Sequence, residues 1–115
     1  MRVRFEEIPD LSSSQVLFYS IVLGDDELSE FDKFDALFSN DNERSAELNI
    51  IYHSIHQISL RGAKKYFFRH EGPASALPGR SFVSDDDIEN SPDFGLRLYA
   101  VVVNDGLVFF VERRY

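Results

Sequence analysis

Basic side chains are concentrated in one short stretch of an otherwise acidic chain. The 115 residues carry 12 Lys and Arg against 20 Asp and Glu, a formal charge of −8. Between positions 61 and 80, however, only one acid, Glu71, accompanies the cations Arg61, Lys64, Lys65, Arg69 and Arg80. Such side chains bind phosphate oxygens, and the fork of N–H donors on Arg matches those oxygens. The stretch indicates phosphate binding, although a solvated helix end and loop would explain it equally well.

Groups suited to proton transfer lie in and near this stretch. His70 is inside it, and an imidazole titrates near neutral pH. Arg97 and Tyr99 are two positions apart, so their side chains share one face if the segment is a strand. For both residues another role stays open, because Tyr99 suits a core with its hydroxyl in water and Arg97 suits an ion pair with an aspartate at 85–87.

The histidines His53 and His56 are three positions apart, a spacing that could suggest a metal site. No carboxylate falls at a supporting position on that turn, and His53 points away from the apolar stripe, so solvated histidines are the favoured interpretation. The chain has no Cys, which excludes a disulfide scaffold and a thiolate metal cage. We therefore expect no metal, no cofactor and a reducing, cytoplasmic location.

The composition limits the class of protein. Apolar residues make up 43% and aromatic residues 14% of the chain, too much for a disordered protein and enough for one core in a single domain. No apolar run approaches the ~20 residues that span a membrane, and the polar start is no signal peptide. A phosphate backbone repels an acidic body, so the charge argues against extensive coating of nucleic acid.

The first part of the chain predicts two strands and two helices. Residues 1–8 alternate like an edge strand that ends at Pro9, and residues 16–23 form an apolar run typical of a buried strand. Apolar positions then recur every three or four residues in two segments separated by the short polar link 39–42, which predicts an antiparallel helical hairpin. The first segment has Leu28, Phe31, Phe34, Leu37 and Phe38, and the second has Leu48, Ile51, Tyr52, Ile55 and Ile58.

Caps and turns define the remaining elements. Asn42 or Ser45 is expected to cap the second helix, and Gly62 to end it in a left-handed conformation. Residues 66–68 are expected to start a strand that ends at Gly72-Pro73, and residues 74–94 to form a long loop.

The clearest signal near the end of the sequence is a β-hairpin. Strands are predicted over residues 96–103 and 107–111, because an Asp-Gly pair links two runs rich in β-formers. Gly106 is expected to supply the positive φ that this turn requires. The predicted fold class is α+β, with the helical hairpin packed on one face of a curled antiparallel sheet.

Three stretches carry a family resemblance. They read FYSIVLGDDELSEFDKFDALF, HQISLRGAKKYFFRHEG and LRLYAVVVNDGLVFFVERRY. They resemble the RelE/ParE toxin superfamily of bacterial type II toxin-antitoxin systems, including its HigB-like branch. The resemblance covers about residues 17–115, so residues 1–115 would form one RelE/ParE-like domain with an extra N-terminal strand.

The resemblance implies a metal-independent endoribonuclease that acts on translated mRNA at the ribosome and has a cognate antitoxin. Such cleavage needs a base for the 2′-hydroxyl proton, cations for the charge on the phosphate and an acid for the leaving oxygen. The implied catalytic residues are Lys64, Lys65, Arg69, Arg97, Tyr99 and Tyr115. The implied RNA-binding residues are Arg61, His70, Arg80, Arg113 and Arg114.

Other interpretations remain open. Lys64 and Lys65 could simply complement the dipole at a helix end, and Arg113, Arg114 and Tyr115 could be a frayed terminus. Ribosome-dependent nucleases are usually basic, whereas this chain is acidic. The alternative is a non-catalytic member of the fold that binds a protein, either an antitoxin or a target such as gyrase, at a sheet edge. A third hypothesis is a domain that self-associates through the apolar face of its helices.

Overall fold

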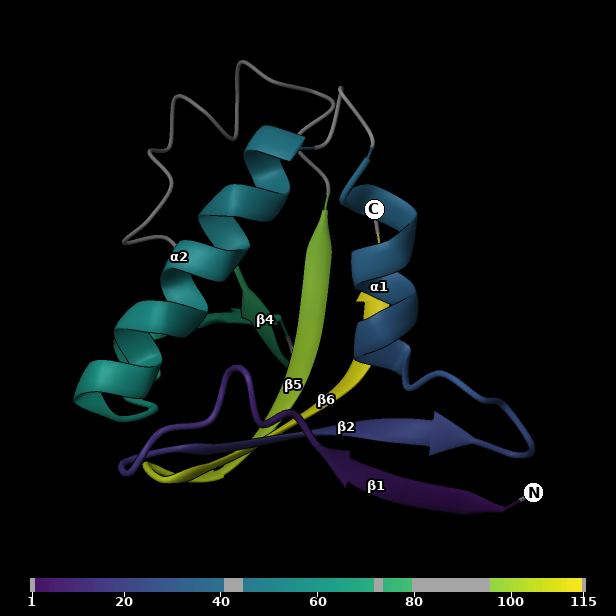
Figure 1. Cartoon of the computed structure of the whole chain (residues 1–115). Helices are drawn as coiled ribbons and strands as arrows, with labels where there is room; N and C mark the ends of the chain where they lie inside the picture. The colour runs from purple at the N-terminus through teal and green to yellow at the C-terminus, as the bar shows by residue number, and fades with distance from the viewer. Residues whose placement is uncertain (1, 41–44, 72–73, 80–95, 115) are drawn as a thin grey trace.

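Both helices lie on the same face of a single sheet, so the chain has an α+β fold (Figure 1). The computed structural model describes residues 2–40, 45–71, 74–79 and 96–114. The strands are β1 Val3–Glu7, β2 Leu17–Leu23, β3 Arg69–Glu71, β4 Ala74–Leu77, β5 Arg97–Asn104 and β6 Leu107–Arg114. The helices are α1 Glu30–Phe38, α2 Ser45–Arg61 and the short 3-10 helix η1 Lys65–Phe67. Within the described residues the six strands have the order β1-β2-β6-β5-β4-β3.

The sheet is mixed, which corrects the expectation of an antiparallel sheet. β2 and β6 run parallel, with Leu17 opposite Leu107 and Ser20 opposite Phe110. All other neighbouring strands are antiparallel. A parallel pair needs a long crossover, which here contains both helices and the strands β3 to β5. Local sequence signals do not reveal such a pairing, because its two strands are far apart in the chain.

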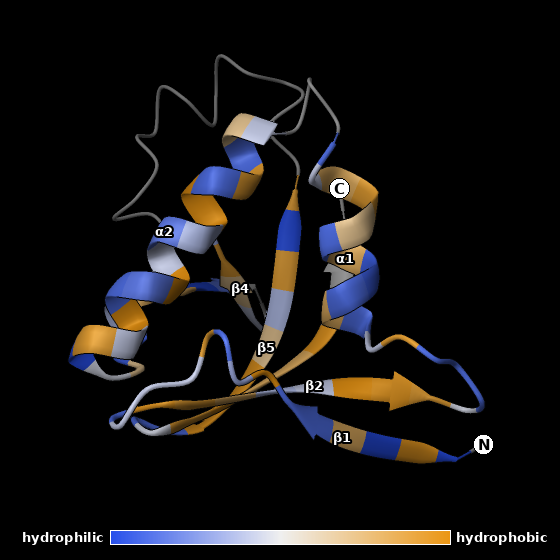
Figure 2. Ribbon diagram, in the orientation of Figure 1, coloured by the Kyte–Doolittle hydropathy of each residue, from blue (hydrophilic) through white to orange (hydrophobic). Residues whose placement is uncertain are grey.

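The core lies between the helices and one face of the sheet. The Phe110 ring on β6 stacks on Phe18 of β2 at 5.6 Å and on Phe31 of α1 at 5.5 Å between centroids. Figure 2 shows apolar and polar residues alternating around both helices. The predicted stripes are buried at Phe31, Phe34, Phe38, Leu48, Ile51, Ile55 and Ile58. These apolar helix faces therefore pack on the sheet and form the core.

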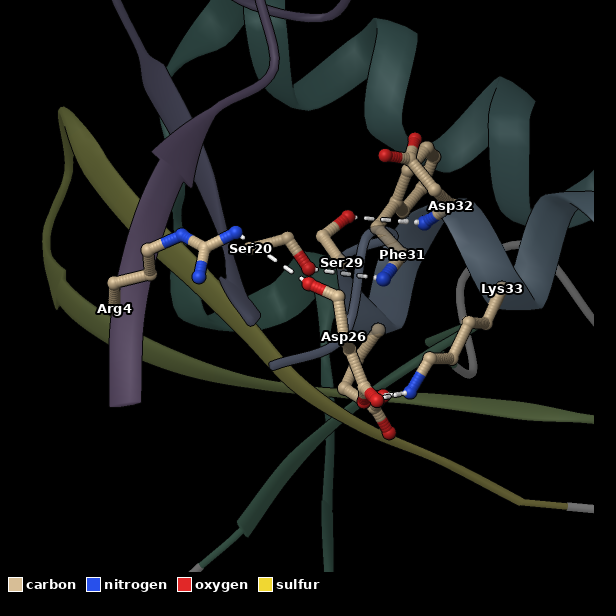
Figure 3. A network of polar contacts seen from close by, with 8 residues as sticks. Arg4, Ser20, Asp26, Ser29, Phe31, Asp32 and Lys33 are labelled. Atoms are coloured by element: carbon tan, nitrogen blue, oxygen red, sulfur yellow. Dashed lines mark hydrogen bonds and ion pairs between the residues drawn. The ribbon is translucent and has the colours of Figure 1, made fainter. Parts of the chain in front are cut away.

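Two serine hydroxyls determine where α1 begins. The Ser29 hydroxyl accepts a hydrogen bond from the Asp32 N–H at 3.1 Å, and the buried Ser20 hydroxyl on β2 accepts one from the Phe31 N–H at 2.9 Å (Figure 3). These bonds satisfy N–H groups that have no partner inside the helix. Leu28, which was expected on the helix stripe, therefore precedes the helix and is exposed.

The same end of α1 is connected to the preceding turn by charges. Lys33 forms ion pairs with Asp26 and, at 2.9 Å, with Glu30. The hydrogen bond to Asp26, followed by that to Glu30, raises the pKa of Lys33. Arg4 of β1 donates a long hydrogen bond to the Asp26 carbonyl at 3.4 Å (Figure 3). These contacts are exposed or partly exposed, so they add little stability.

The two helices run in opposite directions, as the predicted hairpin requires (Figure 1). Tyr52 of α2 connects them, because its hydroxyl donates a hydrogen bond to the Asp35 carboxylate of α1. The Tyr52 ring also lies 6.2 Å from the Phe31 ring between centroids. A residue expected only to fill the core thus also provides a polar contact between the helices.

Raising the pH should weaken this contact. Burial raises the pKa of Tyr52 above its ordinary value, and the hydrogen bond to Asp35 raises it further. The folded state therefore holds the phenolic proton more tightly than the unfolded state. Its contribution to stability is complete below about pH 10 and is lost as the pH rises through the folded-state pKa.

We expect the free energy of unfolding of Tyr52→Phe to fall less steeply than that of the wild type between about pH 9 and pH 11. Urea denaturation at a series of pH values measures both slopes. Equal slopes would contradict the assignment of this titration to Tyr52.

Two local predictions are wrong. Residues 65–67 form η1 instead of the start of a strand, and the turn allows the adjacent Phe67 and Phe68 both to be buried, which strand alternation would prevent. Residues 74–77, expected in a loop, form β4 because β3 and β5 pair with them on both sides. The Gly72-Pro73 turn, the rest of the predicted loop over 80–94 and the Asn42 cap lie outside the described residues.

Glycines end α2 and form the β5–β6 turn in different ways. Gly62 follows α2 with a φ of 95°, which confirms the predicted left-handed end. Ser45 is the first residue of α2 rather than its cap. The β5–β6 hairpin is also confirmed, but Gly106 does not adopt a left-handed φ. Its small size is what matters, because a Cβ there would lie 3.1 Å from the Gln15 carbonyl oxygen.

Candidate functional site

The register of the sheet sorts the candidate residues onto its two faces. Arg69 lies opposite Ala76, and Ala76 lies opposite Tyr99, so all three share a face. Arg97, two positions before Tyr99 on β5, shares it as well. Leu98 between them is buried in the core beneath the helices. Arg69, Arg97 and Tyr99 therefore lie on the face away from the helices, which we call the outer face.

These three residues, the outer-face cluster, differ in exposure. Arg69 is only 8% exposed, whereas Arg97 and Tyr99 are half-buried. The Arg97 guanidinium donates to the Leu96 carbonyl at 3.2 Å. A guanidinium keeps its charge when buried, and that charge acts more strongly there than in water. The outer-face cluster thus combines the buried positive charge of Arg69 with the Arg97 guanidinium and the Tyr99 phenol, which are both within reach of solvent.

A second group of candidates lies on the opposite, helix-covered face. His70 lies directly opposite Ser75 in the pairing of β3 with β4. Together with Lys65 these residues line a cavity of about 150 Å³, which we call the Lys65 pocket. Its remaining walls are Ala63, Phe68 and Val102. A cation, an imidazole and a hydroxyl therefore meet where the end of α2 reaches the edge of the sheet.

Lys64 belongs to neither group. Its ammonium forms an ion pair with the Asp105 carboxylate in the β5–β6 turn, and that hydrogen bond raises the pKa of Lys64. The Ala63 N–H donates to the Asp105 carbonyl at 2.7 Å. These contacts connect the end of α2 to the β5–β6 hairpin. Lys64 therefore pairs with Asp105 and does not join the other candidate residues in one pocket.

The remaining candidates are scattered. Arg61 is the exposed last residue of α2, and His53 and His56 are exposed on the same helix. In β6, Arg113 pairs with Leu98 and Arg114 with Arg97. Arg80, Tyr115 and the aspartates 85–87 lie outside the described residues. The sheet thus divides the expected single pocket into two groups, the outer-face cluster and the Lys65 pocket.

An apolar patch on the outer face was not anticipated. Phe5 of β1 and Val101 and Val103 of β5 are each more than half exposed, at 52%, 53% and 54%. With Phe109 and Val111 of β6 they line a shallow hollow of about 250 Å³, and we call these five residues the outer patch. The sequence did carry a signal, because strands that are apolar at nearly every position are typical of sheets covered on both faces.

Comparisons of the chain with protein-family models, with curated proteins and with solved structures found no match. No helix within the described ranges is long and apolar enough to cross a membrane. Among the same residues, no three His, Asp or Glu side chains gather in a way that could hold a metal ion. Function must therefore be argued from the side chains themselves.

Proposed function

We propose that this chain is a RelE/HigB-like toxin-type protein that cleaves translated mRNA on its outer face without a metal. The observation that supports the proposal is the shared register of Arg69, Arg97 and Tyr99. The pairing of β3, β4 and β5 brings together two guanidinium groups and a phenol, which can serve as the cations and the acid that phosphodiester cleavage needs. The cluster also lies away from the helices, where an extended RNA strand has access.

Each member of the cluster has a separate role in this proposal. Arg97 binds the scissile phosphate through its N–H fork and stabilises the charge that gathers there. The 2′-oxygen attacks phosphorus as its proton passes to water, and the bond to the 5′-oxygen breaks. Tyr99 donates its proton to that leaving oxygen and is reprotonated from solvent, which leaves a cyclic phosphate and a 5′-hydroxyl. The buried Arg69 positions the strand and adds positive potential beneath the phosphate.

Induced expression in bacterial cells tests the proposal. The wild-type chain should arrest growth and produce new mRNA ends on ribosomes. Arg97→Ala should slow cleavage by about 10²–10³-fold, and Tyr99→Phe should do likewise while keeping the ring in place. The control is Arg2→Gln, which removes the same charge from an exposed residue beside β1, at the opposite edge of the sheet from β3. Unchanged toxicity in both cluster variants would contradict the mechanism.

A non-catalytic function in protein binding is the second candidate, and the outer patch favours it. Exposed apolar patches on soluble proteins commonly mark protein interfaces. In that case mRNA on ribosomes stays intact, and Val101→Asp weakens the capture of an antitoxin or target protein while Arg97→Ala does not. The same set of variants therefore separates the two functions.

A further inference from the structure

We propose that the Lys65 pocket binds a phosphate group. The pocket lies on the opposite face of the sheet from the outer-face cluster, so it is a separate site and not part of the proposed catalytic groups. Phosphate binding here does not depend on ribonuclease activity. The ligand is either a small phosphate ester or a backbone phosphate of single-stranded RNA, and only the second source rests on the proposed function.

The three polar groups of the pocket suit a phosphate. Lys65 supplies a positive charge, and the His70 imidazole and the Ser75 hydroxyl supply further hydrogen-bond donors. Lys65 and His70 are exposed and Ser75 is half-buried, so a ligand can reach all three from solvent. Within the described part of the chain, no hydrogen bond or ion pair occupies the Lys65 or His70 side chain. These donors are therefore available to a ligand.

The size of the pocket fits the same ligand. The volume of the pocket is about 150 Å³. That is enough for a tetrahedral phosphate. Ala63, Phe68 and Val102 form its apolar walls.

The charges around the pocket also favour an anion. Asp105 is already paired with Lys64, so it does not compete for Lys65. The end of α2 carries a partial negative charge, but Arg61 in its last turn offsets that charge. Lys65 is therefore left as the cation that faces the ligand.

The position of β3 explains how RNA could use this pocket. Among the strands that the structure describes, β3 is the last at its edge of the sheet, and it has three residues. Arg69 and His70 are consecutive in β3, so their side chains point to opposite faces. An RNA backbone that crosses this edge would place one phosphate near the outer-face cluster and another in the Lys65 pocket.

Titration with inorganic phosphate, followed by the NMR signals of the His70 ring and the Ser75 amide, tests the proposal. The wild type should show a saturable shift of both signals. Lys65→Gln should raise the dissociation constant on the order of tenfold, because a charge-assisted hydrogen bond is lost. Ser75→Ala should raise it by a smaller factor. Lys65 is exposed, so its replacement should leave the melting temperature unchanged.

The control is again Arg2→Gln, which should bind phosphate like the wild type. A shift that does not saturate, or an equal loss of affinity in Arg2→Gln, would overturn the proposal. Arg97→Ala and Tyr99→Phe should keep phosphate binding, so failure of the ribonuclease proposal is distinguishable from failure of this one. Displacement of phosphate by a short single-stranded RNA would identify the backbone as the source, whereas displacement only by glycerol phosphate would identify a small ester.

Discussion

Replacing Phe110 with alanine should lower the free energy of unfolding by about 3–5 kcal/mol. Phe110 is fully buried in β6, and its ring stacks on Phe18 of β2 and Phe31 of α1. The substitution leaves a cavity where two strands and a helix meet. Because domains of this size are stable by only about 5–15 kcal/mol, a large share of the total would be lost.

Urea and thermal denaturation measure this effect, and the midpoint temperature should fall by more than about 10 °C. The matched control is Leu37→Ala, which truncates an apolar side chain of α1 that is 54% exposed. That change should stay within about 0.5 kcal/mol of the wild type. If Phe110→Ala and Leu37→Ala lowered the free energy of unfolding by similar amounts, the placement of Phe110 at the centre of the core would be contradicted.

The second large effect is expected at Gly79, where alanine should cost about 3 kcal/mol. A Cβ at this position would lie 2.2 Å from the Phe67 carbonyl oxygen and 2.6 Å from its carbonyl carbon. Both atoms belong to the backbone, so no side-chain rotation can relieve the overlap. The chain after β4 would have to move away from η1, which would expose the buried Phe67 and Leu77.

Gly24→Ala is the matched control for this substitution. Gly24 has a φ of 57°, but a Cβ there would have no neighbour within 4 Å. Alanine at Gly24 should therefore cost only the strain of the left-handed backbone, about 1–2 kcal/mol. If chemical denaturation shows that Gly79→Ala is no more costly than Gly24→Ala, the close packing of this segment on η1 is wrong.

The elements that sequence could predict are those that short-range signals define. The spacing of Phe31, Phe34 and Phe38 indicates one helical face, and the Asp105-Gly106 pair between two apolar runs indicates a hairpin. In each case the residues that carry the signal lie inside the element that they predict or directly beside it. Even there the physical reason could differ, since Gly106 is needed for its small size and not for its φ.

The features that could not be predicted from the sequence depend on pairing between strands that are far apart in the chain. β4 has small residues and weak strand propensity, and it forms because both of its neighbours satisfy its backbone. In the candidate site, the shared face of Arg97 and Tyr99 follows from their spacing alone. Arg69 joins them only through the β3–β4–β5 register, and the separation of Lys64 from Lys65 depends on the turn at η1.

The parallel pairing of β2 with β6 also affects how the chain folds during synthesis. β6 lies between β2 and β5, although it follows every other strand in the sequence. Until the ribosome has released residues 107–114, the hairpin β1–β2 and the group β3–β4–β5 have no common partner. The backbone edges of β2 and β5 stay unpaired until then, so the pairing of β6 with both strands joins the two parts of the sheet in one late, cooperative step.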